Sequence, residues 1–402
     1  MDLLGGRLMS VSLKMPVSLK MPVSLKMPVS LKMPVSLNKK RRIQEMSHCC
    51  RRVLIIKTSS LGDVIHTLPA VTDAAAAMPG TVFDWVVEES LVEIPGWHPA
   101  VDRVIPVAVR RWRRHPLRCW RTGEWSRFRS LLKEGQWDLV IDAQALLKSA
   151  LLTLGIGVPV YGLDRHSARE SLAAHFYRHR VAVSKGQHAV ERIRQLFAQA
   201  LGYALPPGRG QFGIRSEILQ GANAPVPEAP YIVFVHSTTA AKKHWPEGYW
   251  CTLARLAVDA GYRVCLPWAL PEERARAERI ARISSRICVL PKLNLQGVAS
   301  VIAGAEQVVA VDTGLGHLAA ALDVPCVSLY GPTSPVLVGA YGRSQAHLSL
   351  ADCPASLPVP GVQPALFSPM TAPRVWQAMQ RLRAAKDVDG TRQKARRLDE
   401  VG

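Results

Sequence analysis

Short apolar runs and amphipathic stretches alternate twice along this chain, and this alternation constrains the fold more than any other feature. In the first half, strands are predicted at Val53–Lys57, Thr81–Val87, Leu139–Asp142 and Val158–Gly162, and helices at Val64–Met78, Glu124–Lys133 and Ala189–Leu201. Nearly continuous apolar strands separated by helices are typical of a parallel sheet covered on both faces. Residues 51–205 are therefore predicted to form one Rossmann-like domain.

The same pattern resumes after a Pro/Gly-rich linker at residues 206–230. Strands are predicted at Tyr231–His236, Arg263–Pro267, Ile287–Val289, Gln307–Val311 and Pro325–Leu329, and helices at Glu247–Ala260, Glu272–Ser284 and Leu295–Ala303. We therefore expect a second Rossmann-like domain at residues 231–345. The sequence therefore predicts an α/β fold of two doubly wound domains that face a central cleft. The carboxyl ends of both sheets would surround this cleft, and ligands of open α/β sheets bind at those ends.

The two ends of the chain differ from this pattern. From Val11 the unit VSLKMP recurs every six residues, and such regular prolines forbid a continuous helix or central strand. Residues 1–45 are therefore predicted to be disordered, with Met46 as a candidate working start. At the other end, residues 371–386 are predicted to form a helix that returns to the first domain, followed by a disordered tail at 387–402.

Composition narrows the class of protein. The chain has 402 residues, 48% of them hydrophobic, and eight cysteines without a C-x-x-C pair. We expect a soluble, cytosolic protein with reduced thiols and no structural zinc. The longest apolar stretch, Ser149–Leu163, is interrupted by glycine and proline, so no transmembrane helix is predicted.

One carboxylate stands out in the first domain. Residues 53–71 read VLIIKTSSLGDVIHTLPAV, which places Asp63 at a strand-to-helix turn. The side chain could cap the helix, or it could act on a ligand in the cleft. No G-x-G-x-x-G follows the first strand and no G-x-x-x-x-G-K-[ST] occurs, which disfavours a standard dinucleotide oxidoreductase and a P-loop enzyme.

The second domain offers a candidate anion site. After one apolar strand, residues 312–322 read DTGLGHLAAAL, in which glycines open a helix whose free N–H groups suit an anion. After another strand, HSTTAAKKHWP supplies hydroxyls and the ammonium groups of Lys242 and Lys243. Together they fit a diphosphate, although a tight turn capped by Asp312, a packed His317 and solvated lysines are the alternatives.

Several strings now carry a resemblance. KTSSLGDVIHTLPA, FDWVVEE, AVRRWRR, DAQALLKSA, SARESLA, QHAVER, KHWPE, LPW and VDTGLGHLAAALDVP occur in this order over residues 52–342. They resemble the lipopolysaccharide heptosyltransferase I family of ADP-heptose:LPS heptosyltransferases. The resemblance implies a GT-B fold and inverting transfer of L-glycero-D-manno-heptose from ADP-heptose to Kdo of Kdo-lipid A, without a metal. A later-acting core heptosyltransferase and a non-catalytic basic binding protein on this scaffold are the alternatives.

The resemblance also implies roles for individual residues. Asp63 would be the general base, and Lys243 would stabilise the leaving ADP. The donor side would comprise Thr238, Thr239, Lys243, Trp268, Glu273, Asp312, Thr313, Gly314, Leu315, Gly316 and His317. The acceptor side would comprise Ser59, Ser60, Gly62, Arg110, Arg111 and Arg169, with Gly62 allowing the backbone close to the ligand. Glu272 could replace Glu273 at the ribose, Trp268 could be plain core, and Ser171 stands where the family has proline.

The basic segment at residues 108–121 reads AVRRWRRHPLRCWR, in a chain of net charge +20. Arginine mixed with tryptophan suits nucleic acid, an anionic lipid surface or a solvated loop. The resemblance favours the lipid, and implies a monomer that is peripheral on the cytoplasmic face of the inner membrane. Its expected partners are ADP-heptose, Kdo-lipid A and an anionic membrane surface, and no nucleic acid.

Overall fold

The computed structural model describes residues 51–215, 217, 227–228, 230–354 and 359–399, with residues 386–399 described by their backbone alone. The described residues contain two six-stranded sheets in which every strand pair is parallel. The α/β prediction is therefore confirmed. The repeat at residues 1–45 and much of the linker, predicted as disordered and as a connection, lie outside the described residues.

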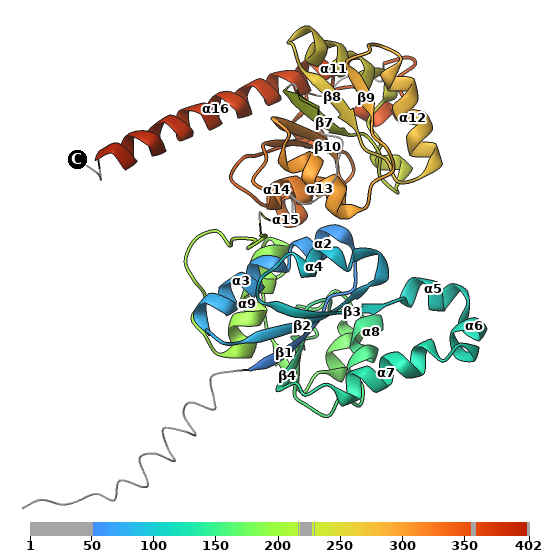
Figure 1. The fold of residues 1–402 in the computed structure, drawn as a ribbon, viewed down its shortest axis with the longest axis vertical. Coiled ribbons are helices and arrows are strands. Elements are labelled where there is room, and N and C mark those ends of the chain that lie inside the picture. Colours follow the sequence, from blue (N-terminus) through green and yellow to red (C-terminus); the bar gives the residue numbers. More distant parts are fainter. Residues whose placement is uncertain (1–50, 216, 218–226, 229, 355–358, 400–402) are drawn as a thin grey trace, which may run out of the picture. The chain divides into compact units, whose positions relative to one another are not determined.

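The first sheet has the strand order β3-β2-β1-β4-β5-β6 (Figure 1). Its strands are β1 (Arg52–Ile56), β2 (Val82–Glu88), β3 (Val101–Val107), β4 (Leu139–Asp142), β5 (Val160–Leu163) and β6 (His179–Val181). The four predicted strands are confirmed to within one or two residues. The edge strands β3 and β6 were not predicted, because polar residues such as Asp102 and Arg103 interrupt the apolar run.

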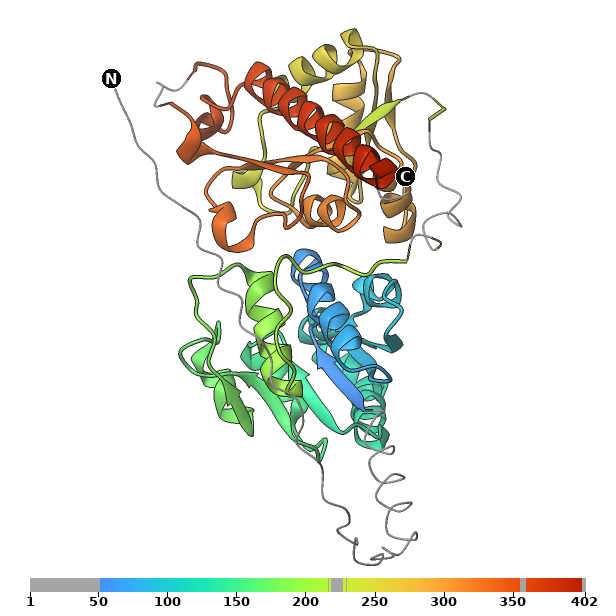
Figure 2. The same ribbon diagram turned by 90° about the vertical axis from the view of Figure 1, so that its left-hand side faces the viewer.

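The helices of this half lie on both faces of the sheet. They are α2 (Leu61–Ile65), α3 (Leu68–Ala77), η1 (Glu89–Leu91), α4 (Glu93–Gly96), α5 (Val109–Arg114), α6 (Pro116–Arg121), α7 (Glu124–Glu134), α8 (Leu147–Ala150), η2 (Leu151–Thr153), η3 (Ser171–Phe176) and α9 (Ala189–Leu201). The predicted helix at 64–78 is divided into α2 and α3, because Pro69 lacks an N–H and occupies the first turn of α3. Figure 2 shows α3 and α9 packed side by side.

The second sheet has the order β12-β11-β10-β7-β8-β9. Its strands are β7 (Tyr231–Val235), β8 (Arg263–Leu266), β9 (Ile287–Val289), β10 (Gln307–Val311), β11 (Cys326–Tyr330) and β12 (Gln345–Ser349). Its helices are η4 (Ala241–Lys243), α11 (Glu247–Asp259), α12 (Pro271–Ala281), α13 (Leu295–Ala303), α14 (Gly314–Ala321), α15 (Pro335–Val338), η5 (Leu350–Asp352), η6 (Ala365–Phe367) and α16 (Ala372–Asp399). Strand β12 extends this sheet past the predicted boundary at residue 345.

The apolar side chains alternate between the two faces of each strand, as a sheet buried on both sides requires. In β1, Val53 and Ile55 join one core cluster while Leu54 and Ile56 join another. All four are fully buried. This double burial explains why the central strands are continuous apolar runs in the sequence.

Two predictions about the C-terminal region are wrong. Helix α16 packs on α11 and on strands β11 and β12 of the second sheet, where Val375 and Met379 are buried beside Phe234 and Trp245. It does not return to the first domain, because its apolar side chains belong to the core cluster of the second sheet. The predicted disordered tail is helical through Asp399. Residues 387–399 contain no proline, and the run from Arg392 to Leu398, RQKARRL, consists of residues that favour helix.

The predicted basic loop is also different in the structure. Its residues form two short helices, α5 and α6, that are joined at His115. Pro116 begins α6, where a missing N–H costs nothing.

Candidate active site

Both sheets place polar loops at the point where the direction of winding changes. In the first sheet, β1 and β4 are neighbours, and the connections from them lead to opposite sides of the sheet. In the second sheet, β7 and β10 are neighbours in the same way. Ligands of open α/β sheets bind outside the carboxyl ends at such switch points. Asp63, Lys148, Lys243 and Asp312 lie in the loops or first helical turns after these four strands.

Asp63 lies in the first turn of α2, directly after β1. Its Oδ2 accepts hydrogen bonds from the Ser60 backbone N, at 2.8 Å, and from the Ser60 Oγ, at 2.9 Å. This is the capping geometry that the sequence offered as one alternative. The carboxylate is nevertheless one third exposed, so capping leaves an oxygen available to a ligand.

The surroundings of Asp63 keep it ionised. Burial raises the pKa of Asp63, whereas the charge of Lys57 and the two hydrogen bonds from Ser60 lower it. The lowering is larger, so the pKa lies below its ordinary value. Lys57 Nζ is 4.0 Å from Asp63 Oδ1. Arg169 is exposed, and its charge also lowers the pKa of Asp63. At neutral pH the group is a carboxylate that can accept a proton.

Three residues around the Asp63 loop were not predicted as functional, namely Lys57, Gln144 and Lys148. Lys57 is buried and donates through Nζ to the Ala143 carbonyl at 2.8 Å. The Gln144 Oε1 accepts from the backbone N of Thr58 and of Ser59. Lys148 Nζ donates to Ser59 Oγ at 3.0 Å. Strand β4 pairs in register with β1, with Asp142 beside Ile56, so the string DAQALLKSA contained the signal.

Lys148 carries its charge among several ionic groups. Burial lowers its pKa, with further lowering by Arg110 and Arg113 and opposite effects of Glu88 and Asp63. Lys148 therefore lies within electrostatic reach of both the Asp63 loop and the basic helix α5. The backbone N of Arg110 donates to Glu88 Oε1 at 3.0 Å, which anchors the start of α5 and leaves the Arg110 side chain exposed.

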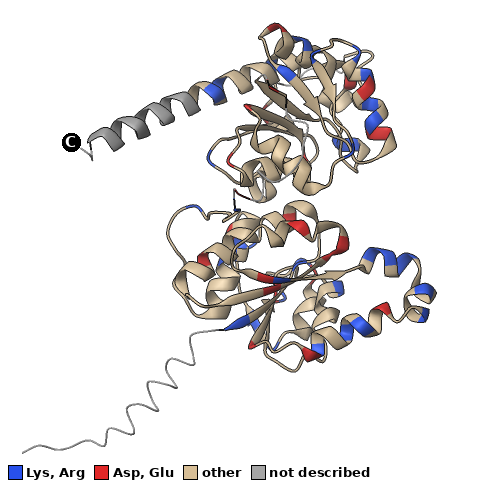
Figure 3. Cartoon of the chain, in the orientation of Figure 1, with Lys and Arg blue, Asp and Glu red and all other residues tan. Residues whose placement is uncertain are grey.

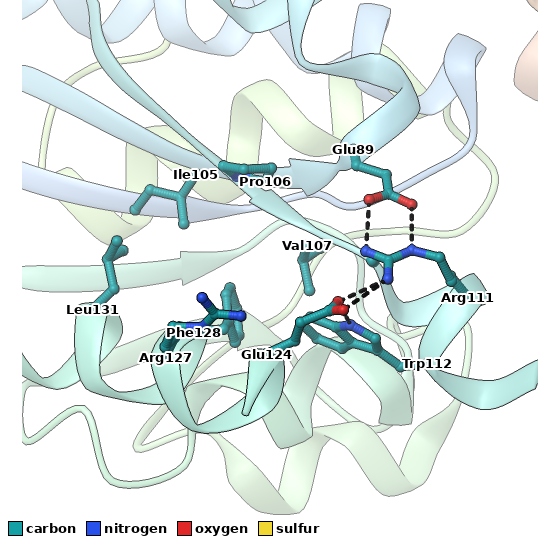
Figure 4. A pocket seen from close by; sticks show the side chains of 11 residues that line it. Glu89, Ile105, Pro106, Val107, Arg111, Trp112, Glu124, Arg127, Phe128 and Leu131 are labelled. Atoms are coloured by element: carbon teal, nitrogen blue, oxygen red, sulfur yellow. Dashed lines mark hydrogen bonds and ion pairs between the residues drawn. The ribbon is translucent and has the colours of Figure 1, made fainter. Parts of the chain in front are cut away.

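Arg111, which is expected on the acceptor side, is paired with two carboxylates in the structure. Its guanidinium lies between Glu89 and Glu124, with ion-pair distances of 3.0 Å and 2.8 Å (Figure 4). The Trp112 indole N–H donates to the same Glu124 at 2.8 Å. Because both of its faces are paired with carboxylates, Arg111 holds α5 against η1 and α7.

The donor half centres on a second ion pair. Lys243 Nζ is 2.6 Å from Asp312 Oδ2, and Thr333 Oγ1 donates to the same oxygen at 2.5 Å. Thr238 Oγ1 donates to the Asp312 carbonyl at 3.4 Å. Thr239 is exposed on the same loop. The structure therefore brings the hydroxyls, the ammonium group and the end of β10 together.

Two predicted donor residues have structural partners. Glu273 Oε2 accepts from the backbone N of Ala269, at 2.8 Å, and of Leu270, at 3.2 Å, as a helix-start carboxylate does. The Trp268 indole N–H donates to the Leu290 carbonyl at 2.6 Å, and Arg274 lies over its ring. Trp268 is half-buried, so one part of its ring surface stays accessible.

The glycines at the two helix starts serve packing between α2 and α14. A Cβ on Gly62 would lie 2.5 Å from His317 Cδ2, and a Cβ on Gly314 would overlap Leu61. The contact with His317 is sufficient to require a glycine at position 62, and the expected role of Gly62 in admitting a ligand stays a prediction. A Cβ on Gly316 would meet Ala310 at 3.3 Å, so this glycine packs α14 onto β10. Thr313 caps the helix without a side-chain bond, and Leu315 is packed against the core.

His317 is buried and pairs with His66. His66 Nε2 and His317 Nδ1 are 3.0 Å apart. Burial lowers the pKa of His317 to about 4, although Asp312 and Asp63 act in the opposite direction. Burial also lowers the pKa of His66 well below its ordinary value, so both imidazoles are neutral at neutral pH, and one donates while the other accepts. His317 is a packing residue within reach of both carboxylates, as one of the alternatives predicted.

Two kinds of feature are not found in the part of the chain that the structure describes. No group of three or more His, Cys, Asp or Glu side chains there is arranged to hold a metal ion. Among the same residues, no helix combines the length and the apolar character needed to span a membrane.

Comparison with known proteins decides the family. The model of glycosyltransferase family 9 (heptosyltransferase) matches residues 125–357. The chain belongs to this family. Lipopolysaccharide heptosyltransferase 1 of Pseudomonas aeruginosa is 62% identical over 298 residues, which are 74% of this chain and 83% of the relative. The protein of that name from Escherichia coli is 52% identical over 295 residues, which are 73% and 92% of the two chains.

Solved structures place this family 9 glycosyltransferase in the same fold. The Escherichia coli heptosyltransferase WaaC with ADP superimposes with a TM-score of 0.75 at 48% identity, covering 82% of this chain and 99% of that one. The same enzyme with ADP-2-deoxy-2-fluoro heptose gives a TM-score of 0.72 at 47% identity, with the same coverage. The predicted GT-B fold and glycosyltransferase class are thereby confirmed.

Proposed function

We propose that this family 9 glycosyltransferase transfers L-glycero-D-manno-heptose from ADP-heptose to Kdo of Kdo-lipid A, with inversion at the anomeric carbon. Identities of 62% and 52% with proteins named lipopolysaccharide heptosyltransferase 1 support this specificity. The observation that carries the mechanism is Asp63, an ionised and partly exposed carboxylate at the carboxyl end of β1. This position and this protonation state support the role of general base.

In the proposed reaction, Asp63 takes the proton of the Kdo hydroxyl as the hydroxyl oxygen attacks the anomeric carbon. The bond from that carbon to the ADP oxygen breaks on the opposite face, and its electron pair leaves with ADP. Ser60 fixes one carboxylate oxygen through two hydrogen bonds, which orients the other toward the acceptor. One base suffices, because the leaving diphosphate is already a weak base.

The acceptor is anionic, and the first half of the site is cationic. The charge of Arg169 lowers the pKa of Asp63, and the charges of Asp63 and Arg110 both act on Lys148. Lys148, Arg110 and Arg169 therefore supply positive charge in this half of the site. We assign these three side chains to the Kdo carboxylates. Arg111, which is paired with Glu89 and Glu124, holds α5 in position for them.

ADP would bind to the second half. Lys243 would exchange Asp312 for the diphosphate, and Thr238 and Thr239 would donate hydroxyl hydrogen bonds beside it. Such fixed donors stabilise the growing charge of the leaving group and allow catalysis independent of a metal. Trp268 would flank the adenine, and either Glu273, while it caps α12, or Glu272 would contact the ribose.

The basic helices give the protein a surface for the membrane that carries the acceptor. Basic residues gather on α5 and α6, as Figure 3 shows, and all of them are arginines. Arg113, Arg114 and Arg118 are exposed there, and the indole of Trp120 is 81% exposed. We propose that these helices bind an anionic membrane surface and make the enzyme peripheral on the cytoplasmic face of the inner membrane.

Release of ADP from ADP-heptose, measured with and without Kdo-lipid A, tests the proposal. We expect release that depends on the acceptor. Release that is independent of the acceptor, or absent with it, would contradict the proposed function. Kdo-lipid A that already carries one heptose tests a later-acting core enzyme, and faster transfer to it would favour that alternative.

A further inference from the structure

An apolar cavity of about 490 Å³ lies beside the acceptor half. Helices α5 and α6 form one side of it, and α7, α8 and η2 form the other. Its walls and rim comprise Val109, Trp112, Arg113, Pro116, Cys119, Trp120, Trp125, Ser126, Lys148, Leu151 and Leu152. Its volume falls within the range of roughly 300–1,000 Å³ that is usual for small-molecule sites.

The apolar groups around this cavity are left open to solvent. The side chains of Trp120, Trp125 and Leu151 are 81%, 41% and 42% exposed, and Leu117 on the same helix as Trp120 is 78% exposed. Isolated apolar residues on a surface need no explanation, but a contiguous set around a concavity marks a binding site. An apolar ligand in the cavity would cover these exposed apolar side chains.

One wall is held in place before any ligand binds. The Trp112 indole donates to Glu124 at 2.8 Å, and Glu124 is fixed in turn by Arg111. The Trp112 ring packs edge-on against Trp125, at 5.7 Å, and against Phe128, at 5.6 Å. The cavity is therefore not a gap that collapses when one side chain rotates.

Lys148 connects the cavity to the reaction. It lines the cavity, and its Nζ donates to Ser59 Oγ in the loop that carries Asp63. Arg113 lines the same rim and acts on the charge of Lys148. An occupant would thus have an apolar part among the tryptophans and an anionic part at the cationic rim, next to the acceptor hydroxyl.

We propose that this cavity binds a fatty-acyl chain of the anionic lipid acceptor. The proposal rests on the proposed function, because it assumes that the acceptor is a lipid whose polar part reaches Asp63. Charge complementarity selects the occupant: an anionic amphiphile satisfies both the apolar walls and the basic rim. Each methylene that leaves water strengthens binding roughly fourfold, so a few carbons suffice for a measurable preference.

Two serines of α7 provide a matched pair of variants. Ser126 and Ser130 are both exposed and lie one helical turn apart, but only Ser126 is among the residues that line the cavity. In Ser126→Phe a ring enters the cavity, whereas in Ser130→Phe it stays outside. The measured quantity is the KM for fully deacylated acceptor divided by the KM for acylated acceptor, each in the same detergent.

We expect the unmutated enzyme and Ser130→Phe to prefer the acylated acceptor, and Ser126→Phe to lose about tenfold of that preference. Saturable quenching of tryptophan fluorescence by 12-bromododecanoate should likewise weaken in Ser126→Phe alone. Equal KM ratios and equal quenching in the two variants would overturn the cavity assignment. Failure of the unmutated enzyme to glycosylate either acceptor would instead contradict the proposed function, and the quenching would still report on the cavity.

Discussion

Lys243 Nζ lies 2.6 Å from Asp312 Oδ2, although 69 positions separate the two residues in the chain. The ammonium and carboxylate groups of this pair neutralise each other. In the proposed donor complex, the diphosphate takes the place of this carboxylate at Lys243, so we expect the affinity for ADP to depend on both members of the pair. The charge that a ligand meets at this point therefore depends on Lys243 and Asp312 together.

Removal of the Lys243 ammonium should weaken ADP binding. In Lys243→Ala the diphosphate loses a cation and also meets an unpaired Asp312, so affinity should fall roughly tenfold or more, about 1.4 kcal/mol. Calorimetric titration with ADP measures the change. Asp312→Asn in the same chain should restore part of the loss, and Lys242→Ala, on the exposed neighbour, should bind ADP normally. Equal effects of Lys242→Ala and Lys243→Ala would move the role away from Lys243.

Replacement of the proposed base should affect turnover and spare binding. In Asp63→Asn the amide oxygen can still accept from Ser60, so the turn is kept while the base is lost. We expect kcat to fall at least ~100-fold, with ADP-heptose affinity and melting temperature close to normal. An Asp63→Asn enzyme with most of its turnover would show that Asp63 is only a cap.

The pH dependence provides a separate test of the same residue. The pKa of Asp63 is below its ordinary value, so the acid limb of kcat/KM should lie below that value and the base should be fully ionised at neutral pH. In Ser60→Ala one stabilising hydrogen bond to the carboxylate is lost, which should move the acid limb to higher pH. An acid limb that does not move would argue against Asp63 as the titrating group.

The basic helices should bind anionic vesicles through net charge. Each arginine near such a surface contributes about 1 kcal/mol, and the attraction fades as salt shortens the screening length of ~8–10 Å. Arg113, Arg114 and Arg118 changed together to Gln should release the protein from vesicles and raise KM for embedded acceptor, with donor binding unaffected. A control triple of equal charge on the second half is Arg255, Arg282 and Arg286, which are exposed. Vesicle binding that survives the first triple at low salt would show that this surface does not face the membrane.

Asp84 should be important for stability rather than for catalysis. Its fully buried carboxylate accepts from Arg103, Trp137 and Arg52 at 2.7–2.8 Å. Asp84→Ala should lower the free energy of unfolding by about 3 kcal/mol, because the Trp137 indole N–H and Arg103 lose this partner and Arg52 keeps only Asp102. Chemical denaturation measures the change. Asp102→Ala, which removes an exposed partner of Arg52, should cost at most about 1 kcal/mol.

The contribution of Asp84 should also depend on pH with a definite sign. Burial raises its pKa, but the bonds from Arg103, Trp137 and Arg52 lower it to below the ordinary value. The stabilisation is therefore complete above the unfolded pKa of roughly 4 and is lost as pH falls through the lower folded value. The unmutated protein and Asp84→Ala should converge in stability on acidification, and a difference that stays constant would refute this account.

The central strands of both sheets, and the position of two candidate site loops at the ends of those strands, could be predicted from the sequence. The central strands, such as Leu139–Asp142 and Gln307–Val311, were predicted with their observed bounds, because burial on both faces leaves an unbroken apolar run. The loops with Asp63 and Asp312 follow such strands, so their position at the carboxyl ends of the sheets followed from the pattern. Edge strands β3 and β12 were missed, because their exposed faces carry polar residues.

The sequence by itself determined the central strands, the main amphipathic helices and which polar residues follow those strands, because these features depend on neighbours within a few positions. Tertiary structure alone decided the partners. Lys148 reaches Ser59 across 89 positions, Arg111 is divided between two glutamates, and His317 meets His66 rather than a ligand. It also decided that α16 covers the second sheet. Such contacts depend on the order of strands in the sheets and on the packing of helices over them, which place residues far apart in the chain within hydrogen-bond distance.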